Sequence, residues 1–318
     1  MSAATEPALP PAAAEYLEHI ASQRRLSALT VDAYRRDLAK LAELAGATPV
    51  ERLAGADLRR FVAKLHGAGL GAASLARTLS AWRSFYRWLG GQGTVEANPA
   101  VGIRAPKRAR RLPKALAPDQ AVQLAAHETD GSALALRDRA MVELLYSSGL
   151  RLAELVSVDW RHFPAEGRRP ASTSWIDLEA NEVTVTGKGG KTRAVPVGAA
   201  AAQALRAWLA ARATLPRADE RALFVSARGG RIAPRSVQQR LALLARRLGL
   251  GVHVHPHVLR HSMASHVLQS SGDLRAVQEL LGHASIATTQ IYTKLDWQHL
   301  ARTYDAAHPR AKAKRSKP

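Results

Sequence analysis

Apolar residues recur at three- and four-residue spacings through the first hundred residues. Between residues 12 and 45 this spacing predicts helices, with apolar positions at Tyr16, Ile20, Val31, Tyr34, Leu38 and Leu41. Thr30 is placed to cap the second of these helices, and Asp57 and Ser74 to begin two more. The pattern therefore predicts an all-helical N-terminal domain.

One stripe in this region is especially apolar and aromatic: Leu75, Leu79, Trp82, Phe85, Tyr86 and Leu89. Such a stripe is more often a packing surface of a helix than a functional site. Arg77, Arg83 and Arg87 are interleaved with it, and basic side chains on the other face of a helix could meet phosphates.

Asn98-Pro99 ends the helical pattern, and a basic segment follows it. IRAPKRARRLPK holds two prolines and six basic residues, from Arg104 to Lys114, with no acidic residue, so we expect a linker at 105–114. It is either a solvated tether or, in a DNA-binding protein, a segment that lies along the phosphate backbone.

The second half begins with helical spacing and then changes period. One helix is expected up to Gly149, which would be its left-handed cap, and another from Leu152 to Val158. Period-two alternation at Val183, Val185, Val195 and Val197 predicts a β-hairpin. Helices are expected again from Ala199 to the end, apart from a basic tail, 309–318, that we expect to be disordered.

The chain is strongly basic. It carries 46 Lys and Arg against 26 Asp and Glu, a formal net charge of +20 over 318 residues. Both halves share the excess, so a polyanion such as nucleic acid is the natural partner. A generally arginine-rich composition is the alternative explanation.

Several classes of function are made unlikely by what the sequence lacks. It has no cysteine, which excludes disulfides, thiolate catalysis and cysteine-based zinc sites. The first residues do not read as a signal peptide, and no apolar run is long enough to span a bilayer, so a cytoplasmic protein is expected.

Four segments could carry chemistry. They are YSSGLRLAEL (146–155), GKGGKTR (187–193), HPHVLRHSMASH (255–266) and LLGH followed by TTQIY (280–292). Taken singly each has an ordinary explanation: Arg151 could pair with Glu154, Lys188 could be a solvated hairpin tip, His283 a capping side chain and Tyr292 a core residue. Their joint order and spacing are much more specific than any one of them.

Together these segments resemble the tyrosine recombinase (lambda-integrase) family, and within it the Xer recombinases, most closely the XerC group. The resemblance spans nearly the whole chain. It implies a mainly α fold with a small β-sheet, in which an all-helical SAM-like core-binding domain (1–104) and a mixed α/β catalytic domain (115–308) bind DNA from opposite sides.

The resemblance also implies a site of six residues. Tyr292 would attack a phosphodiester and form a 3′-phosphotyrosyl ester. Arg151 and Arg260 would hold the non-bridging oxygens, and His257 and His283 would add hydrogen bonds, with His257 the expected proton acceptor. Lys188 would donate a proton to the leaving 5′ oxygen. No metal or other cofactor is implied.

Some alternatives stay open. Lys191 competes with Lys188, although the family pattern favours the first lysine after the strand. A P-loop ending at Gly190-Lys191-Thr192 is rejected because Val185 stands where the first glycine is required. His257 and His261 have the spacing of a helical metal pair, but no neighbouring carboxylate or cysteine completes a site.

The implied partners are double-stranded DNA, a XerD-like recombinase in a heterotetramer, and an FtsK-like cell-division translocase. A C-terminal helix near 299–304 would dock on a neighbouring subunit. A type IB topoisomerase and a non-catalytic DNA-binding protein on the same fold are the competing hypotheses. One departure from the family is RHFPAEGRRPASTSW, residues 161–175, which we interpret as an inserted surface loop.

Overall fold

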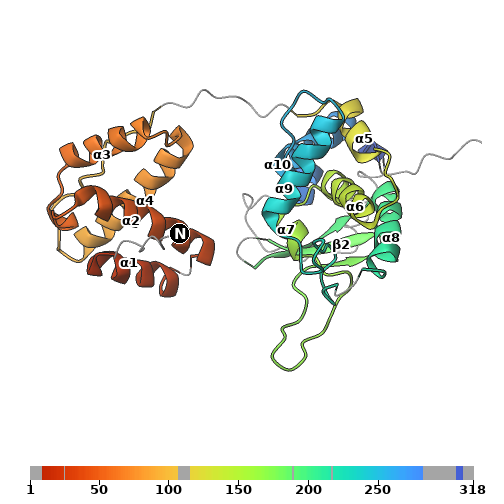
Figure 1. Ribbon diagram of the computed structural model, residues 1–318, viewed down its shortest axis with the longest axis horizontal. Helices are drawn as coiled ribbons and strands as arrows, with labels where there is room; N and C mark the ends of the chain where they lie inside the picture. Colours follow the sequence, from red (N-terminus) through yellow and green to blue (C-terminus); the bar gives the residue numbers. More distant parts are fainter. Residues whose placement is uncertain are drawn as a thin grey trace, which may run out of the picture. The chain divides into compact units, whose positions relative to one another are not determined.

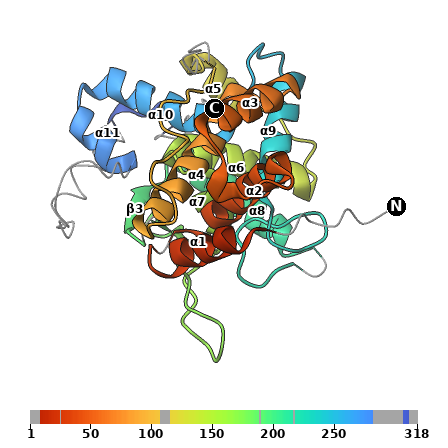
Figure 2. The same cartoon turned by 90° about the vertical axis from the view of Figure 1, so that its left-hand side faces the viewer.

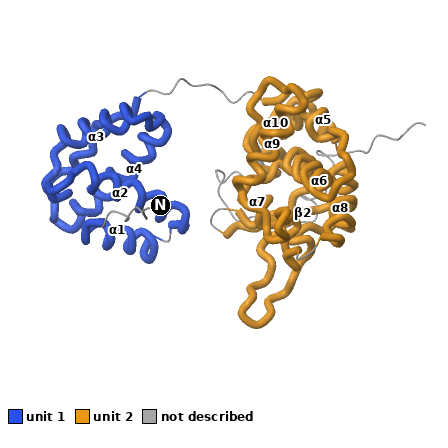
Figure 3. The backbone as a smooth tube through the Cα atoms, in the orientation of Figure 1, with its two compact units in different colours: residues 1–111 blue, residues 112–318 orange. Residues whose placement is uncertain are grey.

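The computed structural model describes residues 9–24, 26–106, 115–187, 190–215, 218–281 and 306–310. The chain divides into two compact units, residues 1–111 and 112–318 (Figures 1 and 3). Each unit has its own hydrophobic core. None of the helices in the described ranges combines the length and the hydropathy that a bilayer span requires.

Unit 1 is all-helical. It contains α1 (Pro11–Ser22), α2 (Ala28–Ala45), a 3₁₀ turn η1 (Val50–Arg52), α3 (Gly55–Gly67) and α4 (Ala72–Gly91). The predicted stripe on α4 is the centre of the core, and Trp82, Phe85 and Tyr86 have no exposed surface. Its interpretation as a packing surface is confirmed.

The predicted helix starts in unit 1 were wrong in detail. Ser27, not Thr30, caps α2, and its side chain accepts a hydrogen bond from the Thr30 backbone N–H. Asp57 lies at the third position of α3, where its carboxylate accepts from the Ala54 N–H. Helix α4 begins at Ala72 after Gly71, ahead of Ser74. Of the three residues, Asp57 does act at a helix start, from inside the helix and three residues beyond the N-cap.

Two of the three arginines on α4 have partners within unit 1. Arg77 pairs with the buried carboxylate of Asp37 on α2, and Arg83 donates to the carbonyl oxygens of Ala100 and Ile103. Arg87 is exposed. Arg77 and Arg83 therefore join α4 to its neighbours, although the side chain of Arg77 is also 41% exposed.

Unit 2 is built around one buried helix. Its helices are α5 (Pro118–Ala125), α6 (Ala133–Ser148), α7 (Leu152–Ser157), α8 (Ala199–Arg212), α9 (Pro234–Arg247), α10 (Pro256–Ser271) and α11 (Leu274–Leu281). Helix α6 is buried on all sides and packs against α8 and α10. It ends at Gly149 in the left-handed conformation, φ +58°, as predicted.

A three-stranded antiparallel sheet lies beside α6, in the order β1-β2-β3. The predicted hairpin is confirmed as β2 (Glu182–Thr186) and β3 (Thr192–Pro196), and β1 (Trp175–Asp177) was not predicted. The expected run of helices from Ala199 onward is interrupted, because within 213–233 the described residues form turns and a bridge between Val225 and Arg231. The left-handed Gly229, φ +87°, makes this reversal possible.

Residues far apart in sequence close unit 2. The Leu116 N–H donates to Ser262 Oγ at 2.8 Å, and the Leu116 carbonyl lies 2.9 Å from His266 Nε2 on α10. At the other end of the chain, buried His308 lies 3.1 Å from the Tyr146 carbonyl oxygen, and Arg310 forms an ion pair with Glu143, which has no exposed surface. Both ends of the unit are thus attached to α6 and α10.

Several expected features lie outside the described residues. They are most of the linker (107–114), the expected docking helix near 299–304, and the tail beyond residue 310.

Candidate active site

Arg151 is placed by the end of α6. Gly149 turns the chain out of the helix, Leu150 is buried, and Arg151 becomes the N-cap residue of α7. The Arg151 N–H donates to Glu154 Oε2 at 2.8 Å, and its guanidinium lies 2.8 Å from Glu154 Oε1. The Arg151 side chain remains 41% exposed, so part of it faces solvent while Glu154 holds its backbone N–H and its guanidinium.

Glu154 is held by a second arginine, from β3. Arg193 donates to both carboxylate oxygens, at 2.8 and 2.9 Å, and both side chains are buried. Burial alone would raise the pKa of Glu154. The hydrogen bonds and charge of Arg193, together with the Arg151 N–H, outweigh burial and lower that pKa to about 2. Glu154 is therefore ionised and links α7 to the sheet.

Arg260, on α10, lies close to the same cluster. Its guanidinium donates to the carbonyl oxygens of Gly149 and Leu281, and it is only 6% exposed. Burial, followed by the positive charges of Arg151 and Arg193, lowers the pKa of Arg260 to about 10, against the opposing effect of Glu154. The side chain is still protonated at neutral pH, and it has N–H groups beyond the two that these carbonyls accept.

Gly187, the residue before Lys188, lies beside this cluster. A Cβ atom at Gly187 would lie 3.5 Å from Glu154 Oε1, 3.6 Å from an Arg193 nitrogen and 3.7 Å from an Arg151 nitrogen. The Gly187 N–H donates to the carbonyl oxygen of Lys191, whose side chain is exposed. Lys188 lies outside the described residues, so the choice between the two lysines stays open.

His257 lies on the first turn of α10, three residues before Arg260, and is exposed. Its ring stacks on that of His255, with centroids 6.3 Å apart and planes at 3°. Among the residues that the structure describes, no group of three or more histidine or acidic side chains is arranged to hold a metal ion. His283 and Tyr292, like Lys188, lie outside that part of the chain.

The structure thus brings Arg151 and Arg260 together and places His257 one turn from Arg260. Three arginines and one glutamate leave the cluster with a net positive charge, and one guanidinium is partly open to solvent. Planar guanidinium groups can donate two hydrogen bonds to one oxyanion, so the cluster is suited to an anion such as a phosphodiester.

Sequence reasoning gave Arg193 no role and considered Glu154 only as a structural partner of Arg151. A signal for both was present. Glu154 follows Arg151 at the spacing by which an N3 glutamate reaches back to the N-cap N–H. Arg193 lies two residues before Val195 on the same strand and is paired with Val185 on β2. It therefore points to the same inward face of the hairpin as these two buried valines. A buried charge there requires a charged partner.

Comparison with known proteins assigns the family. Residues 114–299 match the model of the phage integrase family, and residues 13–93 match the phage integrase N-terminal SAM-like domain. The chain belongs to the phage integrase family.

Its relatives include XerC recombinases of several bacteria. The chain is 55% identical over 309 residues to "Tyrosine recombinase XerC 1" of Ralstonia nicotianae, with 94% of this chain and 93% of that protein covered. It is 51% identical over 302 residues to "Tyrosine recombinase XerC" of Pseudomonas aeruginosa, with 94% and 95% covered. The predicted resemblance to the XerC group and the prediction of an enzyme, a tyrosine recombinase, are confirmed.

Solved structures confirm the fold class. XerH site-specific recombinase in a post-cleavage complex has a TM-score of 0.64 at 22% identity, covering 92% of this chain and 84% of that one. A lambda integrase (75–356) dimer on a core site has a TM-score of 0.63 at 18% identity, covering 88% and 98%. The predicted combination of a helical SAM-like domain and a mixed α/β catalytic domain is therefore correct.

Proposed function

We propose that this recombinase cleaves and rejoins double-stranded DNA at a specific site, with Tyr292 as the nucleophile. The observation that carries the proposal is the arginine cluster of α7, β3 and α10 beside Gly187, in a chain that is 55% identical over 309 residues to a XerC recombinase.

The chemistry assigns each residue a part. The Tyr292 hydroxyl oxygen bonds to phosphorus as the bond to the 5′ oxygen breaks, giving a 3′-phosphotyrosyl ester. His257 accepts the tyrosine proton, and Lys188 gives a proton to the leaving oxygen. Arg151, Arg260 and His283 donate hydrogen bonds to the non-bridging oxygens, where charge increases in the transition state. Attack by another 5′ hydroxyl reverses the step, so the proposal needs neither metal nor cofactor.

The biological setting is proposed on the likeness to XerC proteins. The chain acts in the cytoplasm, in a heterotetramer with a XerD-like recombinase, and an FtsK-like translocase activates it. Its recombination resolves chromosome or plasmid dimers into monomers at cell division. Residues 1–104 and 115–308 contact the same duplex, joined by the basic linker at 105–114.

A nicked suicide duplex tests the chemistry. The wild-type chain and Tyr292→Phe are incubated with duplexes that carry candidate recombination sites, without divalent metal. We expect a covalent protein–DNA adduct from the wild type alone. An equal adduct from both would place the nucleophile elsewhere, and tight binding with no adduct on any site, with the partner recombinase added, would favour a DNA-binding role.

The same assay separates Lys188 from Lys191. Substitution of the lysine that protonates the leaving oxygen should slow cleavage of ordinary DNA by about 10²-fold or more. It should have little effect on a duplex whose 5′ leaving atom is sulfur, because a thiolate leaves without a proton. We expect this pattern for Lys188→Ala, and its appearance in Lys191→Ala instead would reassign the acid.

A further inference from the structure

The inserted residues 161–174 form an ordered arm of unit 2. They leave the body of the unit between Trp160 and β1 and extend beyond it in both views (Figures 1 and 2). At the apex, Glu166 and Arg169 exchange two backbone hydrogen bonds of 2.9 Å, and Gly167 has φ +55°. A glycine with positive φ at the first central position is typical of a tight hairpin turn.

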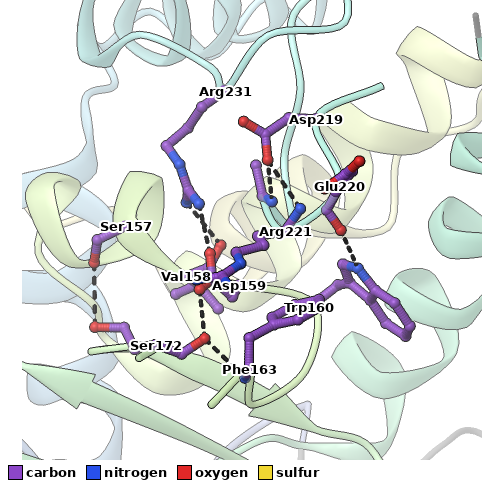
Figure 4. A network of polar contacts seen from close by, with 12 residues as sticks. Ser157, Val158, Asp159, Trp160, Phe163, Ser172, Asp219, Glu220, Arg221 and Arg231 are labelled. Carbon is purple, nitrogen blue, oxygen red and sulfur yellow. Dashed lines mark hydrogen bonds and ion pairs between the residues drawn. The ribbon is translucent and has the colours of Figure 1, made fainter. Parts of the chain in front are cut away.

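A polar network holds the base of the arm (Figure 4). Ser172 Oγ donates to Asp159 Oδ2 at 2.6 Å and accepts from the Phe163 N–H at 3.0 Å. The Ser172 N–H donates to the Phe163 carbonyl at 2.9 Å, so the two legs are paired here. Asp159 in turn forms an ion pair with Arg231 from the neighbouring segment.

Cation–π contacts and a further hydrogen bond also stabilise the two legs of the arm. The guanidinium carbons of Arg161 and Arg221 lie 4.7 and 5.2 Å from the centroid of the Phe163 ring. Arg221 also donates to the Pro170 carbonyl at 2.8 Å, across the arm. The conformational entropy of the arm is thus largely lost before any partner binds, which favours a binding role over that of a loose connection.

The arm begins at the end of the sheet that carries the candidate site. Thr186 Oγ1 donates to the Thr173 carbonyl, and the Thr186 N–H donates to Ser174 Oγ at 3.1 Å. The next residue, Gly187, borders Arg151, Glu154 and Arg193. A duplex that places a phosphate at this cluster must therefore pass close to the base of the arm.

The arm presents positive charge to solvent. Arg161, Arg168 and Arg169 are exposed, against one exposed acid of the arm, Glu166. Arg169 also forms an exposed ion pair with Glu220, at 3.0 Å. Within the described part of the chain, nothing pairs with the Arg168 guanidinium at the apex. Each leg advances about four residues from the paired base to the apex, which at ~3.3 Å per residue allows a reach of up to roughly 13 Å. That distance corresponds to about four base pairs of B-form DNA.

We propose that the arm 161–174 binds backbone phosphates of the DNA that flanks the cleavage site, with Arg168 making the outermost contact. This proposal rests on the proposed function, since it names a further contact with the same substrate. It predicts a contact that depends on charge and not on base sequence, because an arginine at the tip of a two-residue turn meets phosphates more readily than base edges.

The test is the salt dependence of DNA binding by the full chain. Affinity for a duplex with long flanks is measured by fluorescence anisotropy between 50 and 200 mM salt. Loss of one phosphate contact lowers the slope of log K against log salt by about 0.9. We expect that change for Arg168→Ala, with binding roughly fivefold to tenfold weaker at 0.1 M salt, and about twice the change in slope for Arg168→Ala combined with Arg169→Ala.

Two matched variants serve as controls. Arg206→Ala removes another exposed arginine of unit 2, which donates to Leu178 beyond the other end of β1, and should leave the slope unchanged. Glu166→Gln removes the acid of the arm and should strengthen binding. On a duplex that stops, on both sides of the cleaved phosphate, short of the base pairs that the arm would reach, wild type and Arg168→Ala should bind with the same slope.

An unchanged slope for Arg168→Ala on the long duplex would overturn the proposal, as would the same loss for Arg206→Ala. Unchanged binding of one chain together with weaker assembly on two sites would overturn it in favour of a protein contact. If the wild type forms the Tyr292 adduct while the arm variants bind normally, only the arm proposal fails. If the wild type forms no adduct, the proposed function itself fails.

Discussion

Replacing Arg193 by methionine tests the buried ion pair that supports Arg151. Arg193→Met keeps an unbranched side chain on the inward face of β3 but removes both hydrogen bonds to Glu154, which is 3% exposed. The native environment lowers the pKa of Glu154 from 4.5 to about 2. A shift of that size corresponds to about 3 kcal/mol of stability at neutral pH. Breaking a buried pair typically costs a similar amount, ~3–5 kcal/mol, and here Glu154 would keep only its contacts with the partly exposed Arg151.

The sign of the pH dependence sharpens this prediction. Since the folded-state pKa is depressed, the contribution of Glu154 is complete above about pH 5 and is lost as the pH falls toward 2. In Arg193→Met the pKa of Glu154 should be higher than in the wild type, because only Arg151 is then left to oppose the effect of burial. The stability difference between wild type and variant should therefore be largest near pH 7 and should shrink as the pH is lowered through 4.

Urea denaturation at several pH values measures the effect, with the tryptophans of unit 2 as the fluorescence signal. Arg169→Met is the matched control, because it breaks an Arg–Glu pair that is 66% and 78% exposed and should change stability by less than about 1 kcal/mol. A loss below 1 kcal/mol for Arg193→Met, or a loss that does not change with pH, would refute the reasoning.

Three further predictions concern the surroundings of the site. Arg310→Ala should cost about 3 kcal/mol in urea denaturation by leaving Glu143 buried and unpaired, and residues 306–310 should become sensitive to proteolysis; full protection would contradict this. Gly149→Ala should lower the melting temperature by the equivalent of about 1–2 kcal/mol, since φ is +58° and the new Cβ would displace the end of Met263; an unchanged melting temperature would argue against a required left-handed residue. Arg260→Lys should reduce the rate of covalent adduct formation by about 10²-fold or more, and a near-normal rate would exclude a planar, two-donor contact with phosphate.

The core could be predicted from the spacing of apolar residues, because burial of one face of a helix or strand requires that spacing. The stripe on α4 and the alternating valines of β2 and β3 were recognised from spacing alone, and both are buried. Helix ends were less accurate, because a capping side chain acts from either side of the boundary, as Asp57 does from inside α3. Strand β1 has only three residues, which is too few for a period to be visible.

Prediction of the site depended on different information. The positions of Arg151, His257 and Arg260 came from a family pattern, and the structure adds that Arg151 and Arg260 belong to one electrostatic cluster. The alternation of β3 indicated that Arg193 is buried, but not its partner, because Glu154 lies 39 residues away and their contact depends on how β3 packs on α7. Lys188, His283 and Tyr292 remain predictions from that pattern.

The hydrogen bonds of Leu116 have a consequence for how the chain folds during synthesis. Their partners, Ser262 and His266, lie 146 and 150 residues further along the chain. During synthesis, the segment around Leu116 therefore cannot form these native hydrogen bonds until α10 has left the ribosome. The helices of unit 1 have only nearby contacts to make and can fold well before that point. A ribosome-bound chain should accordingly pass through a stage in which unit 1 resists protease and unit 2 does not.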